Sequence, residues 1–450
     1  MNGDLLEKYN IPAPRYTSYP TVPYWGENCP TTEAWTSRVL QAFEENKSLS
    51  LYIHLPYCEN LCTYCGCNKR ITKNHEVEMP YLLAVLQEWA LYTALLPEKP
   101  VLRELHLGGG TPTFFSPENL HWLLSEILET VELPEHFEFG FEAHPANATY
   151  KHLKVLRQLG FTRISIGVQD FDDHILKTIN RQQSYEEVAQ VVAWARELGY
   201  RSINFDLIFG LPFQTPAHIR DNVQKVAQLR PDRLAFYSYA HVPWIKPSQR
   251  AYSEADLPNG TAKRALYELG RELLESAGYR EIGMDHFALP GDSLYKALET
   301  GSLHRNFMGY TPFLTRLSLA LGASSISDAW SAFVQNEKHI EKYQELVHAG
   351  RFPFVKGHLL TEEDQVLRSH ILNIICRGTT EWKSPNMQCE ALYDGLERLH
   401  PMIADGLVKL HPFQLEVTPA GKAFVRNICL ALDARYWKQQ PEGQLFSRVV

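Results

Sequence analysis

Long apolar runs and an excess of positive charge are both missing from this 450-residue chain. No run of about 18 apolar residues is present, so no membrane-spanning helix is expected. The start, MNGDLLEKYN, has no basic stretch followed by an apolar one, so no secretory signal is expected. The formal net charge is −8, whereas nucleic-acid binders are usually basic. We therefore expect no membrane partner and no nucleic-acid partner.

Internal repeats, low-complexity tracts and a disulfide framework are missing too. The hydrophobic content of 44% and aromatic content of 12% are typical of a globular enzyme. Four of the eight cysteines, Cys29, Cys376, Cys389 and Cys429, are scattered without the spacing of a small secreted domain. A reducing cytoplasm is the compartment that fits this pattern.

Short apolar runs alternate with helical segments between residue 50 and residue 240. The runs are SLYIHL, ELHLG, FEFGFEA, RISIGVQ, SINFDLIFG and RLAFYSYA. Helix starts lie between them: Glu187 follows Ser184 by three residues, and Ser116 and Thr215 each precede a proline. Strands that alternate with helices predict parallel βαβ units. Six in a row favour an α/β fold of the TIM-like type, a partial (β/α)6 barrel, over an open two-faced sheet.

The two ends of the chain depart from this rhythm. Residues 1–45 contain IPAPRYTSYPTVPYWGENCP, whose prolines predict an irregular N-terminal arm or lid. Residues 46–345 are expected to form the barrel. Residues 346–450 have the pattern of a mostly helical, winged-helix-like domain, with 12 Lys and Arg against 11 Asp and Glu. Because a DNA reader would be basic, this domain is expected to pack against the barrel or cover it.

Four cysteines lie within ten residues of YCENLCTYCGCNK, after the first predicted strand. Cys58, Cys62 and Cys65 have the spacing C-x3-C-x2-C. Three thiolates can hold three irons of a [4Fe–4S] cluster and leave the fourth iron open to an amine and a carboxylate, which S-adenosylmethionine offers. Zinc is the alternative, but zinc sites usually need a second pair of ligands, and none follows here.

Polar residues and glycines follow the ends of successive predicted strands. Gly108 to Gly110, in HLGGGTPT, allow a ligand to approach the backbone, although a plain tight turn is the alternative. The polar residues and their neighbours at the later strands are Glu142, Gln169, Arg181, Asp206, Ala240 and His241. Such residues at one end of successive parallel strands mark the active-site face of a barrel.

These motifs, in this order, resemble those of the radical S-adenosylmethionine (SAM) superfamily, and in detail the oxygen-independent coproporphyrinogen III oxidase family. The resemblance covers YNIPAPRYTSYPT, YIHLPYCENLCTYCGCNK, ELHLGGGTPT, ISIGVQDF, DLIFGLPFQT and YSYAHVP. It continues in IGMDHFA, LHRNF and VRNIC. The cysteine triad is common to the superfamily, whereas the CxC ending and the whole set of motifs are specific to the family.

The resemblance implies a partial (β/α)6 barrel with an N-terminal arm and a mostly helical C-terminal domain. It also implies an oxidoreductase of porphyrin and haem biosynthesis, which converts two propionates of coproporphyrinogen III into vinyls and gives protoporphyrinogen IX. In that family a reduced cluster cleaves SAM, the resulting radical takes a hydrogen atom from the propionate, and CO2 and one electron leave. A porphyrinogen substrate, an electron donor, a final electron acceptor and a monomeric chain are expected.

The resemblance also assigns site residues. Cys58, Cys62 and Cys65 are expected to hold the cluster. The cluster-bound SAM is expected at Tyr52, Tyr64, Gly109, Glu142 and Ile326. A second SAM molecule is expected at Gly110, Thr111, Gln169, Arg181, Asp206 and Ala240. The catalytic candidates are His54, beside the cluster, and Cys67, which is expected to handle a proton, a hydrogen atom or the last electron near the substrate; a small buried thiol is the alternative.

Some residues depart from the family pattern near the expected substrate side. His144 stands where aspartate is common, Met308 where glutamine is usual, and Leu317 and Ala320–Leu321–Gly322 where the family has an aspartate and Gly-x-Gly. The candidates for binding the propionates are Arg15 and Arg305.

Two other functions compete with the oxidase hypothesis. A haem chaperone of the superfamily would have an aromatic residue in place of Cys67 and no PRYTSYPT arm, and this chain has both oxidase features. A radical methyltransferase is disfavoured by LHRNF and the C-terminal motifs.

Overall fold

The computed structural model describes residues 3–26, 29–441, 443 and 445–449. Within these residues, one mixed sheet has twelve strands in the order β16-β15-β14-β13-β1-β4-β5-β6-β7-β8-β10-β9. Its parallel centre consists of β1 (Ser48–Leu55), β4 (Val101–Gly109), β5 (Glu138–Ala143), β6 (Phe161–Gln169), β7 (Ser202–Phe209) and β8 (Arg233–Ser238). All neighbours in this group pair in parallel. The six strands predicted from the sequence are confirmed.

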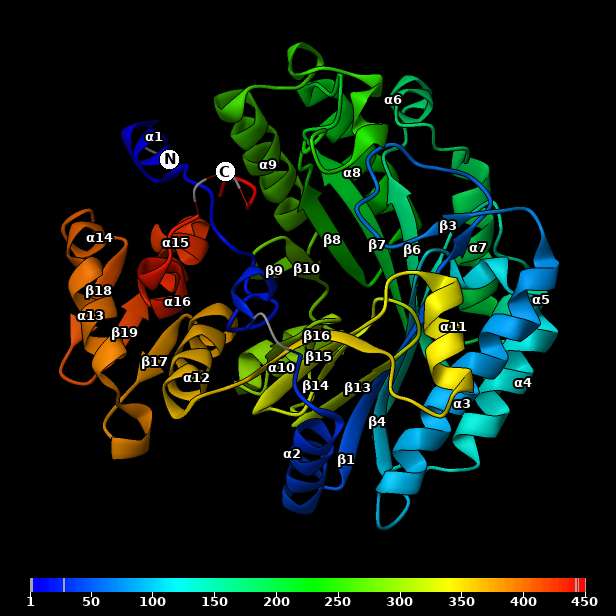
Figure 1. Cartoon of the computed structure of the whole chain (residues 1–450). Helices are drawn as coiled ribbons and strands as arrows, with labels where there is room; N and C mark the ends of the chain where they lie inside the picture. Colours follow the sequence, from blue (N-terminus) through cyan, green and yellow to red (C-terminus); the bar gives the residue numbers. More distant parts are fainter. Residues whose placement is uncertain (1–2, 27–28, 442, 444, 450) are drawn as a thin grey trace.

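Helices follow the strands and cover the outer face of the curved sheet (Figure 1). They are α3 (Glu78–Leu95), α4 (Pro117–Leu128), α5 (Tyr150–Gln158), α7 (Tyr185–Glu197), α8 (Pro216–Leu229) and α9 (Gly260–Ser276). The short α6 (Asp173–Thr178) lies beyond the strand ends and packs in a separate apolar cluster. The predicted helix starts are confirmed, since Ser184 and Glu187 form a capping box and Ser116 accepts a hydrogen bond from the backbone of Asn119.

The sheet remains open, as expected for a partial barrel. On one side β1 pairs in parallel with β13 (Leu317–Leu321), and antiparallel strands β14 (Ile326–Asp328), β15 (Ala332–Asn336) and β16 (Phe354–Leu359) extend that edge. On the other side β8 is followed by β10 (His286–Ala288) and β9 (Arg280–Gly283). The remaining elements of this body are α10 (Ser293–Thr300), β11 (His304–Asn306), β12 (Gly309–Thr311) and α11 (Ile340–His348).

Side chains alternate between the two faces of the parallel strands, as the pleat requires. Leu49, Leu51 and Ile53 of β1 are fully buried in the core that the helices cover. The intervening positions of the strands face the barrel interior and are mostly polar: Ser50, Tyr52, Glu104, His106, Glu138, Glu142, Arg163, Ser165, Asn204, Asp206, Arg233 and Tyr237. The barrel interior can therefore bind polar groups while its outer face stays apolar.

A network of buried charges closes one end of this interior. Arg233 donates to Glu138 at 3.0 Å and to Asp292 at 2.7 Å, and Arg163 donates to Glu138 at 3.0 Å. Burial opposes ionisation of Glu138, but Arg233 and Arg163 lower its pKa to about 2. These charges satisfy one another, so this end of the barrel is scaffold.

The C-terminal domain packs beside the barrel (Figure 1). Its elements are α12 (Glu362–Arg377), β17 (Thr379–Glu381), α13 (Glu390–Arg398), α14 (His400–Ala404), β18 (Val408–His411), β19 (Gln414–Val417), α15 (Val425–Ala431) and α16 (Ala434–Lys438). The predicted hairpin followed by a helix is present as β18, β19 and α15. Arg368 of α12 binds Asp328 of β14 and thereby links the domain to the sheet.

The first 45 residues, expected to form one arm, pack in two places. Tyr9, Tyr16 and Tyr19, which follow or end α1 (Gly3–Tyr9), belong to the apolar core of the C-terminal domain. In contrast, Trp35 and Phe43 of α2 (Thr32–Glu45) belong to the barrel core. Apolar side chains thus attach the two halves of the arm to different bodies.

Across the described residues, no helix combines the length and the apolar character that crossing a bilayer requires.

Candidate active site

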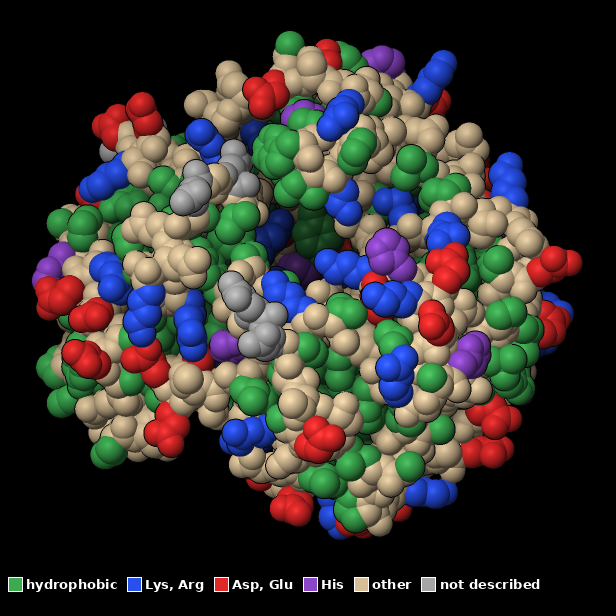
Figure 2. Space-filling view, in the orientation of Figure 1, with side chains coloured by type: hydrophobic (Ala, Val, Ile, Leu, Met, Phe, Trp, Pro, Cys, Tyr) green, Lys and Arg blue, Asp and Glu red, His purple; other side chains and the backbone are tan. Residues whose placement is uncertain are grey.

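A cavity of about 340 Å³ lies at the carboxyl ends of the parallel strands. Figure 2 shows its opening as a hollow with Lys and Arg side chains around it. Predicted site residues that line it are Cys58, Cys62, Tyr64, Cys65, Cys67, Gly109, Gly110, Thr111, Glu142, Gln169, Arg181 and Asp206, together with the departing residues His144 and Met308. The structure therefore brings most of the predicted residues to one place.

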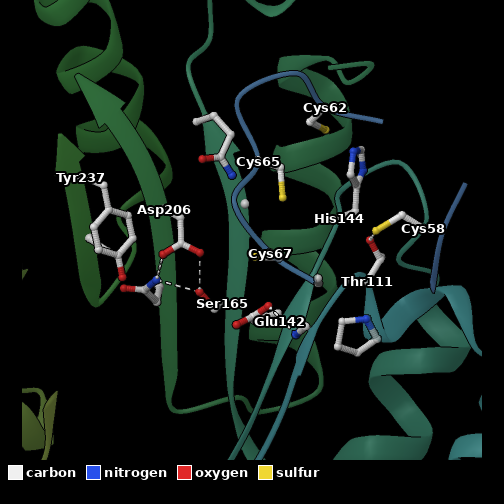
Figure 3. Close-up of a pocket in the computed structure, with 18 of the residues that line it drawn as sticks. Cys58, Cys62, Cys65, Cys67, Thr111, Glu142, His144, Ser165, Asp206 and Tyr237 are labelled. Atoms are coloured by element: carbon white, nitrogen blue, oxygen red, sulfur yellow. Dashed lines mark hydrogen bonds between the residues drawn. The ribbon is translucent and has the colours of Figure 1, made fainter. Parts of the chain in front are cut away.

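Residues 58–67, the cysteine loop, cross the mouth of this cavity (Figure 3). The loop leaves β2 (Tyr57–Cys58) and returns through β3 (Arg70–Ile71), which pairs in parallel with β2. Its middle is held by backbone contacts, because Thr63 N donates to Ile179 O at 3.0 Å and Lys246 Nζ donates to Gly66 O at 2.8 Å. The thiols are thus carried by an anchored loop.

The turn after β4 fixes the start of the cysteine loop. Gly110 N donates to Leu55 O at 2.8 Å, and Thr111 N donates to Tyr57 O at 2.9 Å. A Cβ atom on Gly110 would lie 2.6 Å from the carbonyl carbon and oxygen of Pro56. The sequence was interpreted as leaving bare backbone for a ligand, but at Gly110 the missing side chain makes room for the protein's own backbone. Thr111 Oγ1 also lies 3.2 Å from Cys58 Sγ.

His54 supports the far end of the same loop. Its ring is buried, with Nε2 2.9 Å from Asn68 O and Nδ1 3.2 Å from the Tyr52 hydroxyl. A Cβ atom on Gly109, which has φ +117°, would lie 2.8 Å from this ring. Burial lowers the pKa of His54, so the ring is neutral at pH 7. Because both ring nitrogens contact other groups of the protein, His54 positions the loop and Gly109. Its catalytic role stays a prediction.

Two carboxylates face the cavity from strands on either side of β6, Glu142 from β5 and Asp206 from β7. Glu142 accepts from Gly109 N at 3.3 Å, and its side chain is 43% exposed. Asp206 accepts from Ser165 Oγ and from Asn204 Nδ2, both at 3.0 Å. Burial, together with the negative charge of Glu142, raises the pKa of Asp206 to about 6. A cation or a set of hydroxyl donors in the cavity would relieve this repulsion.

Arg181 lies beside a thiol of the cysteine loop. Its Nη1 lies 3.6 Å from Cys62 Sγ and 3.4 Å from the Tyr64 hydroxyl, while Nη2 donates to Gly167 O. Burial and the charge of Arg181 lower the pKa of His144 to about 3, so His144 is neutral. The departure from aspartate therefore removes a negative charge from this part of the cavity.

Other predicted residues lie outside the lining. Ala240 O accepts from Gln249 Nε2 at 3.1 Å, and the same amide donates to Tyr64 O at 3.3 Å. Ile326 begins β14 and packs with the cluster around Trp25. Tyr52 and His54 lie behind Gly108 and Gly109, and Leu317 and Ala320 are buried within β13.

Sequence reasoning missed several polar residues of the cavity, among them Ser165, Asn204, Tyr237, His286 and Tyr310. A signal was available for two of them. Ser165 and Asn204 interrupt apolar strands at alternate positions, and Asn204 precedes Asp206 by two residues, so the pleat places them on the same face. The other three need tertiary contacts between distant segments.

The cysteine set fits an iron–sulfur cluster better than a single ion. All eight cysteines are free thiols, and Cys58, Cys62 and Cys65 share the cavity. The zinc alternative lacks a second pair of ligands in the sequence, whereas three thiolates can hold three irons of a cluster. The hydrogen bond from Cys67 and the charge of Lys69 lower the pKa of Cys65 and favour its thiolate, the form that binds metals.

Comparisons with known proteins agree with this site. The Radical SAM superfamily matches residues 52–226, from β1 into α8. The oxygen-independent coproporphyrinogen III oxidase of Pseudomonas aeruginosa is 38% identical and covers 100% of this chain and 98% of its own length. The enzyme of the same name from Escherichia coli is 37% identical, covering 99% and 98%. This chain belongs to the oxygen-independent coproporphyrinogen III oxidase family.

Solved structures agree with the family assignment. The coproporphyrinogen III oxidase (HemN) of Escherichia coli, described as a radical SAM enzyme, superimposes with a TM-score of 0.88 at 36% identity. The match covers 93% of this chain and 97% of that chain. The fold predicted from the resemblance is therefore confirmed. Membership in the oxygen-independent coproporphyrinogen III oxidase family also implies a [4Fe–4S] cluster and SAM, which the cysteine loop and the two carboxylates suit.

Gly110→Ala tests how the cysteine loop is positioned. Its Cβ atom would collide with the Pro56 backbone, and such overpacking costs about 1–3 kcal/mol or displaces the loop. We expect less iron and sulfide per chain after anaerobic reconstitution, measured by chemical assay. Gly291→Ala, between β10 and α10, is the matched control, because no atom lies within 4 Å of its Cβ position. Equal cluster content in all three proteins would contradict this account.

Proposed function

We propose that this chain catalyses the oxygen-independent conversion of coproporphyrinogen III to protoporphyrinogen IX. The observation that carries the proposal is the anchored C-x3-C-x2-C-x-C loop over a cavity lined by Glu142 and Asp206. The full-length similarity to relatives named for this activity supports it. Each propionate would lose CO2, one proton and two electrons as it becomes a vinyl. Neither competing function accounts for both the loop and the full-length similarity.

Different residues of the cavity would bind the cluster, bind SAM and exclude water. Cys58, Cys62 and Cys65 would hold the cluster, and Arg181 would offset part of the thiolate charge beside Cys62. When bound, the cluster and SAM supply one-electron reduction and hydrogen-atom abstraction. Glu142 would accept hydrogen bonds from cofactor hydroxyl or ammonium groups, and the cavity walls would keep water away from the reacting carbon.

We propose that the chain works as a monomer that exchanges electrons with a separate donor and a separate acceptor. A donor is needed because the reaction starts with a reduction, and an acceptor is needed because one electron per propionate remains after hydrogen abstraction.

An anaerobic turnover assay tests the proposed function. The reconstituted protein, given coproporphyrinogen III, SAM, a reductant and cell extract as acceptor, is expected to form protoporphyrinogen IX and 5′-deoxyadenosine. Cys58→Ser is expected to lose the cluster absorbance and the activity, whereas Cys389→Ser, a half-buried thiol elsewhere, keeps both. If the wild-type protein forms 5′-deoxyadenosine without protoporphyrinogen IX, the oxidase function is refuted.

We also propose two SAM sites in one cavity. Tyr52, Tyr64, Gly109, Glu142 and Ile326 are assigned to the cluster-bound molecule, and Gly110, Thr111, Gln169, Arg181, Asp206 and Ala240 to the second. The repulsion between Glu142 and Asp206 supports two cationic ligands, since each would neutralise one carboxylate. The positions of Tyr52, Ala240 and Ile326 outside the lining give these three residues no support.

Asp206→Asn tests the second SAM site. The wild-type holoenzyme is expected to bind two molecules per chain in equilibrium dialysis. The variant is expected to bind the second about tenfold or more weakly, because it loses a charge-assisted contact. Asp221→Asn, whose carboxylate is half exposed and pairs with Lys225, is the control. A wild-type stoichiometry of one would contradict the proposal.

Cys67 is proposed to act next to the substrate. It lines the cavity and its side chain is exposed there, so it is accessible to a bound molecule. A role in transferring a proton, a hydrogen atom or an electron fits a thiol that the cluster does not require.

Cys67→Ser separates this role from cluster binding. We expect normal iron and sulfide content but turnover lowered by about 100-fold or more, as is typical when a proton-transfer group is removed. Full turnover with an intact cluster would contradict the proposed role. Loss of the cluster would instead make Cys67 a part of the loop's structure.

A further inference from the structure

A buried arginine without a counter-ion lies beside the cavity. Arg305 of β11 is only 6% exposed, and its Nε and Nη1 have no hydrogen-bond partner. Within the described residues, its guanidinium has no salt-bridge partner either. Its neighbour is Tyr310, which lies opposite Arg305 on β12 with its ring centroid 4.7 Å from the guanidinium carbon. Because burying an unpaired charge is costly, such a group implies an anion that is supplied by a ligand.

Two cavity-lining side chains next to Arg305 are also unsatisfied. Tyr310 and His286 both line the cavity, and their ring centroids lie 5.1 Å apart. The Tyr310 hydroxyl and His286 Nδ1 are buried without a hydrogen-bond partner. His286 Nε2 lies 3.4 Å from the Tyr237 hydroxyl. Burial, followed by the charges of Arg305 and Arg15, keeps the pKa of His286 well below its ordinary value, so the ring is neutral. Unpaired polar atoms therefore gather at one wall of the cavity.

Two carboxylates near Arg305 are already engaged. Asp285 pairs with Arg15, whose guanidinium also lies 5.8 Å from the centroid of the Tyr237 ring. Glu138 is bound by Arg163 and Arg233. Arg305 is thus left as a cation next to Tyr310, which lines the cavity, and a carboxylate can accept from a guanidinium and a hydroxyl together.

We propose that Arg305, with the Tyr310 hydroxyl and the His286 ring, binds a substrate carboxylate that is retained in the product. This inference rests on the proposed function, in which two of the four propionates remain. A guanidinium stabilises a carboxylate anion, so it would oppose the loss of that group as CO2. The contact suits a propionate that orients the ring and does not react.

Binding of two porphyrins by the reconstituted full chain tests this inference without turnover. Coproporphyrin III carries all four propionates, and protoporphyrin IX carries the two retained ones. For Arg305→Met we expect the dissociation constants of both, measured by equilibrium dialysis, to rise by a similar factor of about 10 to 100. The dissociation constants of Arg305→Lys should lie between those of Arg305→Met and the wild type, because lysine keeps the positive charge but cannot form the two parallel hydrogen bonds of a guanidinium. Arg316→Met, at a half-exposed arginine that pairs with Glu45, should bind normally.

Thermal unfolding separates binding from a structural role. Removing an unpaired buried charge should leave the Tm of Arg305→Met unchanged or raise it. A lower Tm with unchanged porphyrin binding would overturn the carboxylate site and make Arg305 structural. Weaker binding of coproporphyrin III alone would mean that Arg305 holds a reacting propionate, which also overturns the inference. If the wild type binds both porphyrins and Arg305→Met binds them equally well, the inference alone fails; a wild-type chain that binds neither overturns the proposed function as well.

Discussion

Close contact between two backbone segments sets the geometry of this site. Gly110 packs against Pro56 so tightly that a single Cβ atom would collide with it, and two hydrogen bonds join the same segments. The turn after β4 therefore fixes where the strand β1 ends and the cysteine loop begins. Because β1 and β4 pair in parallel, the register of the sheet determines the position of Cys58. At the other end of the cysteine loop, the contact between the His54 ring and Asn68 O fixes where the loop ends.

Charges in the barrel interior are of two kinds. Glu138 and Arg233 belong to a network in which two arginines pair with two carboxylates at the start of the strands. Glu142 and Asp206 face the cavity and repel each other, while Arg305 has no anionic partner in the part of the chain that the structure describes. Paired charges stabilise the scaffold. Charges without a partner favour the binding of ligands of the opposite charge. The first kind of charge shapes the cavity, and the second kind is available to bind a ligand in it.

Local sequence signals predicted the fold well, because strand alternation and helix capping are local properties. The six parallel strands, the capping box at Ser184 and the cysteine loop were all readable from short segments. Contacts between distant segments were not. Glycine is required at position 110 because the backbone of Pro56 lies against it. Among the described residues, Arg305 is unpaired because other arginines bind the carboxylates near it. The same limit explains why residues 1–45 looked like one arm, although each half has a different packing partner.

The attachment of the N-terminal segment to the C-terminal domain has a consequence for the order of assembly. Tyr16 donates to Asp433 across 417 positions, and Arg426 binds the carbonyl of Pro14 across 412. On a ribosome that adds about 5–20 residues per second, roughly 20 to 80 seconds pass between the synthesis of Pro14 and Tyr16 and the synthesis of these partners. The barrel strands emerge in between and can pair without either end. The domain that contains α15 and α16 is therefore completed by residues 9–19, which can take up their places only after that domain has been synthesised.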